Sequence, residues 1–211
     1  MAYHSTRIME ILKEATAEQH RDAEGRRLQK DMVRGRLPAG TYAAWLGQML
    51  LLHRVLWERI ESHRGDHPVL AGIVRDEGLH VANLCADLAL LEIHTGDVVP
   101  LRSMDRAIQL IVLTSESDPL SLLGYNYVLE GSMNGNRFIA RALEHTLPVA
   151  AISYLDPYGE EQRPVWQSYR ERMNEAGFDE AQGERMVGTA RDMFTFIAEM
   201  SDELVRETVP A

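Results

Sequence analysis

The chain of 211 residues contains a single cysteine, Cys85. One thiol excludes an intramolecular disulfide and a metal cluster held by cysteines, so a reducing compartment is the simpler expectation. The first residues, MAYHSTRIMEILKE, have no apolar run of the signal-peptide type. From these two absences we expect a cytoplasmic protein.

Long hydrophobic runs and positive charge are also scarce. The longest uncharged stretch, residues 37–53, is shorter than the ~20 apolar residues of a membrane span and predicts a buried helix. The net charge of -10 opposes nonspecific attraction to nucleic acid and to anionic membranes. Only residues 1–36 are basic on balance, with eight Lys/Arg against six Asp/Glu. This segment is either a docking face for an acidic partner or an ordinary helix surface of mixed charge.

The feature that is present throughout is helical periodicity. Apolar residues recur three and four positions apart, and from Met186 to Leu204 they predict one long helix with a single apolar face. Breakers at 35–38, 65–68, 96–100 and 148–164 separate the segments, and Asp118-Pro119 predicts the start of a helix towards Leu143. We find no repeat and no strand-like alternation. The prediction is an all-α, single-domain bundle of six to eight helices spanning residues 1–211.

The first segment with chemical content places His20 and Glu24 one helical turn apart. At this spacing a carboxylate can accept the Nδ1 proton of the imidazole and leave Nε2 free as a neutral metal ligand. An ordinary surface pair is the alternative interpretation.

The second segment is an apolar helix interrupted by Gly131 and Gly135. Each glycine costs about 1 kcal/mol relative to alanine inside a helix. Such residues therefore mark a bend, close helix packing, or close approach of the backbone to a ligand. The motif alone leaves packing and ligand binding both open.

Together these segments resemble the heme oxygenase family, in which a proximal histidine lies on the first helix and a kinked, glycine-containing helix covers the distal heme face. The stretches that carry the resemblance are LKEATAEQHRDAE at 12–24, the glycine pair, YRERMN at 169–174 and the aromatic Phe194. The resemblance covers about residues 8–206. It implies an all-α bundle of the heme oxygenase type.

By position, the resemblance makes His20 the axial ligand of the heme iron and Glu24 the acceptor of its second proton. Gly131 and Gly135 become the backbone over the distal side. Lys13 and Arg170 become partners of the heme propionates. Tyr127 and Phe194 complete the implied cofactor-binding residues.

The implied activity is the oxidative opening of heme b to biliverdin, iron and carbon monoxide. Dioxygen is the co-substrate, and a ferredoxin or an NAD(P)H-dependent reductase supplies the electrons. The implied partners include neither nucleic acid nor a membrane.

The sequence departs from the family pattern on the distal side. Many members have an aspartate directly after the first glycine, where it organises water, and this chain has Ser132. Asn134, Asn136 or Arg137 are the candidates to organise water instead. Two propionate contacts of other members also change, to Asn126 and Trp166.

Three other functions remain open. One is a non-catalytic heme-binding or trafficking protein on the same fold. The others are a nonheme di-iron enzyme and a hydrolase of the TenA type. Glu77-x-x-His80 is the one Glu-x-x-His pair suited to a di-iron site, and without a second pair we expect His80 to be a surface capping residue.

Cys85 is expected to be a buried structural residue on an apolar stripe. The remaining histidines lack an orienting partner in the sequence and are expected to be ordinary surface or core residues. They are His4, His53, His63, His67, His94 and His145.

Overall fold

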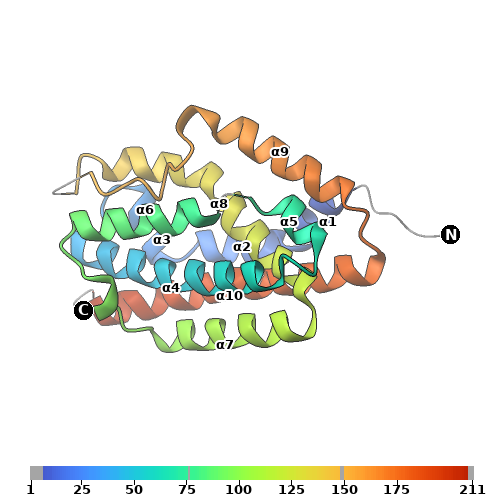
Figure 1. The fold of residues 1–211 in the computed structure, drawn as a ribbon. Coiled ribbons are helices and arrows are strands. Elements are labelled where there is room, and N and C mark those ends of the chain that lie inside the picture. The colour runs from blue at the N-terminus through green and yellow to red at the C-terminus, as the bar shows by residue number, and fades with distance from the viewer. Residues whose placement is uncertain (1–6, 76, 148–149, 209–211) are drawn as a thin grey trace.

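A computed structural model describes residues 7–75, 77–147 and 150–208, and the regular structure within these ranges is entirely helical (Figure 1). The all-α prediction is confirmed. In chain order the α-helices are α1 (Ile8–Ala15), α2 (Ala17–Glu24), α3 (Arg27–Val33), α4 (Ala39–His63), α5 (Pro68–Ile73), α6 (Glu77–Leu90), α7 (Arg102–Ser117), α8 (Leu122–Leu143), α9 (Gln162–Glu175) and α10 (Glu180–Thr208). Single 3-10 turns occur at η1 (Thr95–Asp97), η2 (Pro119–Ser121) and η3 (Gly159–Glu161).

The predicted count of six to eight helices is wrong for the described residues, because the chain also forms the short helices α2, α3 and α5. The segment 12–24 divides at Thr16, whose backbone leaves the helical region. The Thr16 hydroxyl donates to the carbonyl of Leu12 at 2.7 Å, and such back-bonding bends helices. His20 therefore lies on α2, the second helix.

The predicted helix boundaries follow the local chemistry. Pro68 begins α5 and Pro119 begins η2, where a proline needs no hydrogen-bond partner for its nitrogen. The start of α10 is a reciprocal cap, because Gln182 N donates to Asp179 Oδ1 at 2.7 Å and Asp179 N donates to Gln182 Oε1 at 2.9 Å. The long C-terminal helix and the helix ending at Leu143 are both confirmed.

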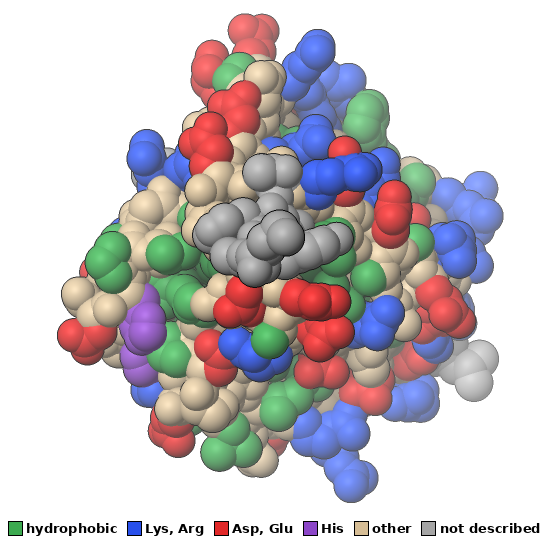
Figure 2. All heavy atoms as spheres, turned by 90° about the vertical axis from the view of Figure 1, so that its right-hand side faces the viewer, with side chains coloured by type: hydrophobic (Ala, Val, Ile, Leu, Met, Phe, Trp, Pro, Cys, Tyr) green, Lys and Arg blue, Asp and Glu red, His purple; other side chains and the backbone are tan. Residues whose placement is uncertain are grey.

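Helix α10 contacts most of the other helices. It packs against α1, α2, α3, α4, α7 and α8. Helices α4, α7 and α10 run side by side along the molecule, and α9 crosses one end beside α1 and α5 (Figure 1). That end carries intermingled acidic and basic side chains (Figure 2). Within the described residues, none of the helices combines the length with the apolarity needed to cross a bilayer.

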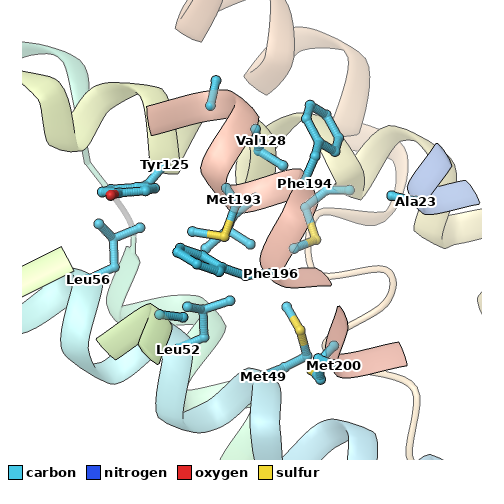
Figure 3. Packing of buried hydrophobic residues seen from close by; sticks show 14 of the residues in the cluster. Ala23, Met49, Leu52, Leu56, Tyr125, Val128, Met193, Phe194, Phe196 and Met200 are labelled. Atoms are coloured by element: carbon cyan, nitrogen blue, oxygen red, sulfur yellow. The ribbon is translucent and has the colours of Figure 1, made fainter. Parts of the chain in front are cut away.

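Two phenylalanines show how α10 divides the interior. Side chains two residues apart on an α-helix are related by a rotation of about 200° about the helix axis, so they point to nearly opposite sides. Accordingly, Phe196 points towards Leu52 of α4, whereas Phe194 points to the side where Val128 and Ala23 lie (Figure 3). One face of α10 therefore fills the core, and another faces α2 and α8.

Helices α8 and α10 are in direct backbone contact at Gly124. A β-carbon at this position would overlap the hydroxyl of Thr189 and the carbonyl oxygen of Met186. Thr189 is itself fixed, since its hydroxyl donates to the carbonyl of Ser121 at 2.7 Å. Gly124 lies on the same helix as Gly131 and Gly135, and the sequence gives no signal that it is the most tightly packed of the three.

We predict that Gly124→Ala lowers the free energy of unfolding by about 2 kcal/mol or more, because a backbone carbonyl cannot move aside as a side chain can. Chemical denaturation of the two proteins measures the difference. The matched control is Gly188→Ala, on an exposed part of α10 where a β-carbon would meet nothing within 4 Å. That variant should be as stable as the parent or slightly more so. Equal stability of the two variants would contradict the packing argument.

Candidate functional site

A cavity of about 600 Å³ opens between α2, α4, α8 and α10. Its size is within the ~300–1,000 Å³ that hold cofactor-sized ligands, and its walls are mainly apolar. The lining residues are His20, Ala23, Glu24, Gln29, Val33, Trp45, Met49, Val128, Leu129, Gly131, Ser132, Asn134, Gly135, Asn136, Phe138, Ile139, Tyr154, Phe194 and Ile197. Eight of the residues predicted from the sequence thus meet at one cavity, namely His20, Glu24, Gly131, Ser132, Asn134, Gly135, Asn136 and Phe194.

One wall presents an accessible imidazole. The His20 side chain is 53% exposed and packs edge-on against the ring of Phe194, with 5.2 Å between ring centroids. The His20 nitrogen nearest Glu24 is Nε2, at 3.5 Å from Oε1, whereas the sequence analysis expected Nδ1 there. An exposed imidazole can turn about its Cβ–Cγ bond. The four-residue spacing therefore determines that Glu24 lies next to His20, but not which ring nitrogen faces the carboxylate.

Another wall is formed by α8, where the two glycines have different surroundings. A β-carbon at Gly131 would lie 3.3 Å from the indole ring of Trp166, so this glycine admits the packing of α9 on α8. A β-carbon at Gly135 would meet no other atom within 4 Å. Since Gly135 lines the cavity, its bare backbone widens the space in front of α8.

The polar side chains on this wall are mostly bonded to their own helix. The Ser132 hydroxyl donates to the carbonyl of Leu129 at 2.7 Å, and the Asn134 amide donates to the carbonyl of Gly131 at 3.0 Å. The Asn136 amide lies 3.5 Å from the Ser132 oxygen. Ser132 therefore holds its hydroxyl against the helix backbone.

Four predicted residues do not line the cavity: Lys13, Tyr127, Arg137 and Arg170. Lys13 and Arg170 are exposed on α1 and α9, two helices that pack together. Burial raises the pKa of Tyr127, and its hydrogen bond with Thr16 and the positive charge of Arg170 oppose that rise. Arg137 is half-buried further along α8.

Sequence reasoning missed part of the wall. Trp45 and Met49 belong to the apolar face of α4 that the periodicity identified, but nothing in that pattern assigns them to a cavity. Tyr154 comes from the segment between α8 and α9. The indole N–H of Trp45 is buried without a hydrogen-bond partner among the described residues.

Tyr154 is held in place by a buried carboxylate. Asp87 accepts hydrogen bonds from the backbone N–H of Ser153 and of Tyr154, at 3.0 and 2.8 Å, and from the Ser153 hydroxyl at 2.8 Å. Three donors on one carboxylate anchor the segment to α6. The residues are 66 and 67 positions apart, so no local motif reveals the contact.

Two histidines have buried partners that the sequence did not reveal, and the surface role expected for His80 is wrong. His80 is not a surface cap, because it is 2% exposed and its Nε2 lies 3.0 Å from Oε2 of Glu130. His53, expected to lack a partner, is buried with Nε2 3.0 Å from the Tyr154 hydroxyl. Both partners come from distant parts of the chain.

The structure also bears on the predictions for Cys85 and for a di-iron site. Cys85 is half-buried rather than buried, and its sulfur lies 3.6 Å from the Arg54 guanidinium. The side chain of Glu77 lies outside the described part of the structure. Among the side chains that are described, no group of three or more His, Cys, Asp or Glu has the geometry to hold a metal ion.

The accessible imidazole of α2 and the helix backbone of α8 line one apolar cavity in an all-helical protein, an arrangement that can enclose a flat apolar cofactor and ligate its metal. The chain belongs to the heme oxygenase family, whose sequence pattern matches residues 6–203.

Individual relatives are distant but match most of the chain. Heme oxygenase 2 of Mus musculus is 23% identical over 206 residues, which cover 93% of this chain and 65% of that protein. The chain thus spans less than two thirds of the length of this relative.

Solved structures share the fold. Heme oxygenase from Leptospira interrogans superposes with a TM-score of 0.85 at 23% identity, covering 93% of this chain and 98% of the other. Heme oxygenase-1 from Synechocystis sp., in complex with heme, gives 0.84 at 21% identity, covering 95% and 93%.

We predict that Asp87→Ala lowers the free energy of unfolding by about 3 kcal/mol, because it leaves three donors around Tyr154 without their charged acceptor. Thermal and denaturant unfolding measure the loss. Asp97→Ala is the control, since that carboxylate is exposed and the change should stay within about 0.5 kcal/mol. Equal effects of the two substitutions would show that Asp87 does not anchor the segment.

Proposed function

We propose that this chain is a heme oxygenase that opens heme to biliverdin, iron and carbon monoxide, with dioxygen as co-substrate. The observation that carries the proposal is the single cavity lined by both His20 on α2 and Gly135 on α8, in a chain of this family. When bound, heme supplies both the iron that activates dioxygen and the ring that is cut.

The residues of the cavity suit a porphyrin. Its apolar lining matches a flat apolar ring, and the accessible His20 imidazole is a ligand suited to iron. Glu24 is the positioning residue for this ligand: once the ring turns, it accepts the Nδ1 proton and holds Nε2 towards the metal. Phe194 packs edge-on against the imidazole and supports it from α10.

Lys13 and Arg170 bind the propionates in this proposal. Both are exposed cations on the packed pair α1 and α9, so they can meet carboxylates at the rim while the apolar ring lies inside. Tyr127, close to both Thr16 and Arg170, lies beside them.

Gly135 leaves room beside α8 for dioxygen, and the backbone of Gly131 lines the same cavity. Asn134 and Asn136, which line the cavity, orient water there, and Arg137 supports them from the same helix. Electrons come from a ferredoxin or an NAD(P)H-dependent reductase, and a cytoplasmic location agrees with the single cysteine.

A heme carrier without turnover is the second candidate. It is favoured by Ser132, which stands where many family members have an aspartate and whose hydroxyl is bonded to the Leu129 carbonyl. Binding of hemin is common to both functions, so only turnover separates them.

We expect the purified protein to bind hemin with a Soret band and to form biliverdin when a reductant and dioxygen are added. Chromatography of the product identifies the bilin. His20→Ala should change the ferric spectrum and reduce turnover at least 100-fold, because the iron loses its ligand. His94→Ala is the control, since His94 is an exposed histidine beside Asp97 and away from the cavity. Full hemin occupancy without bilin would leave the carrier function, and an unchanged spectrum in His20→Ala would place the ligand elsewhere.

We also predict that Gly135→Leu weakens hemin binding at least tenfold without lowering protein stability. The side chain would extend into the cavity without meeting a neighbouring atom near its base, and leucine forms helix better than glycine. Hemin titration and thermal unfolding measure the two quantities separately. Gly188→Leu, the same change on the exposed face of α10, should leave hemin binding at the parent value. Normal binding by Gly135→Leu would mean that the ligand does not approach α8 there.

A further inference from the structure

A cluster of buried polar side chains lies directly behind the cavity wall. Glu130 of α8 and His80 of α6 are 5% and 2% exposed, and their Oε2 and Nε2 atoms are 3.0 Å apart. The hydroxyl of Tyr158 lies 3.3 Å from both of these atoms. Tyr158 is half-buried, so this end of the cluster reaches towards the surface.

Two polar atoms of the cluster lack a hydrogen-bond partner in the described part of the structure. They are His80 Nδ1 and Glu130 Oε1, and both are buried. Unpartnered buried polar atoms are rare in native structures and often mark an ordered water or a functional group.

A second buried pair continues the cluster towards the cavity. The ring of His53 lies beside that of His80, with 5.3 Å between centroids. His53 Nε2 is in turn 3.0 Å from the hydroxyl of Tyr154, and Tyr154 lines the cavity. The series of side chains thus runs from the half-buried Tyr158 to the cavity wall.

The protonation states suit proton transfer. Burial and the neighbouring His80 lower the pKa of His53 well below its usual value, so this imidazole is neutral and has one donor and one acceptor nitrogen. Burial and the charge of Glu130 raise the pKa of Tyr154, so its hydroxyl keeps its proton. Each group can accept a proton on one side and give one on the other.

We propose that Glu130, His80, His53 and Tyr154 form a relay that carries protons to the cavity and replaces the carboxylate that Ser132 does not supply. The inference rests on the proposed function, because ring opening consumes protons at the distal side of heme. His80 Nδ1 is the atom through which a bridging water joins the two imidazoles.

The proposed relay conserves both protons and charge. When the Tyr154 hydroxyl gives a proton to the cavity, His53 replaces it from Nε2. His53 then takes a proton at Nδ1 through the bridging water from His80. His80 is resupplied at Nε2 from Tyr158, or from Glu130 after that carboxylate has taken a proton at the outer end. One proton enters at the outer end and one leaves at the inner end, and no group changes its net charge. Each imidazole ends with its proton on the opposite nitrogen, and exchange with the bridging water returns it to the starting tautomer before the next transfer.

Turnover with hemin tests the relay through two conservative variants. Tyr154→Phe removes the inner hydroxyl, and Glu130→Gln keeps the volume and a hydrogen bond to His80 but not the exchangeable acid. Both should slow bilin formation about 100-fold with hemin affinity unchanged. The matched control is Tyr42→Phe, because Tyr42 is an equally buried phenol whose hydroxyl donates to the carbonyl of Ala151, off the path, at 2.7 Å. Bilin formation at the parent rate in either relay variant would overturn the proposal.

A second measurement uses the protein without heme. In samples with nitrogen-15 in the histidine rings, Glu130→Gln should shift the ring nitrogens of both His80 and His53, although of these two histidines residue 130 contacts only His80. A shift confined to His80 would overturn the relay. If the parent protein forms no bilin at all, the proposed function fails, and the nitrogen shifts alone then decide whether the four groups are coupled.

Discussion

The separation of the two cavity walls depends on the close contact between α8 and α10. At Gly124 the two helices approach so closely that a β-carbon would overlap the Met186 carbonyl. The same helix α10 packs against α2 and places Phe194 beside His20. Because both walls rest on one rigid helix, the distance between the His20 imidazole and the α8 backbone is set by helix packing and not by loops.

The parts of the site that the sequence predicts are those encoded within one helix. His20 and Glu24 are one turn apart, and Gly131 and Gly135 are also one turn apart, so each pair shares a face whatever the rest of the fold does. The helical periodicity likewise predicts α4, α8 and α10. What one helix cannot encode is its distance from another, and the tight contact at Gly124 therefore carries no local signal.

The parts that the sequence does not predict are pairings between distant segments. Glu130 meets His80 at a separation of 50 residues, and His53 meets Tyr154 at a separation of 101. His53 does occupy a position in the apolar stripe of α4, and a polar residue in such a stripe is a sign of a buried partner. The pattern does not identify the partner of His53, because the partner depends on how α4, α6 and the segment before α9 pack together.

The position of Glu130 explains why a relay is needed at all. Glu130 and Ser132 are two residues apart on α8, and so they point about 200° away from each other. Ser132 faces the cavity, and Glu130 faces α6 behind it. A carboxylate on that side cannot reach the cavity directly, so any proton it provides must pass through side chains that span the wall. His53 and Tyr154 occupy that position.

The free-energy cost of burying this cluster also favours a role in proton transfer. Burying a histidine and a carboxylate removes both from water, and the hydrogen bond between them offsets only part of that cost. Leaving Nδ1 of His80 and Oε1 of Glu130 without partners adds to it. Apolar side chains of similar volume would pack between α6 and α8 at no such cost, so stability alone gives no reason for this cluster. A role in moving protons does, because a relay needs groups that are buried, close together and incompletely bonded.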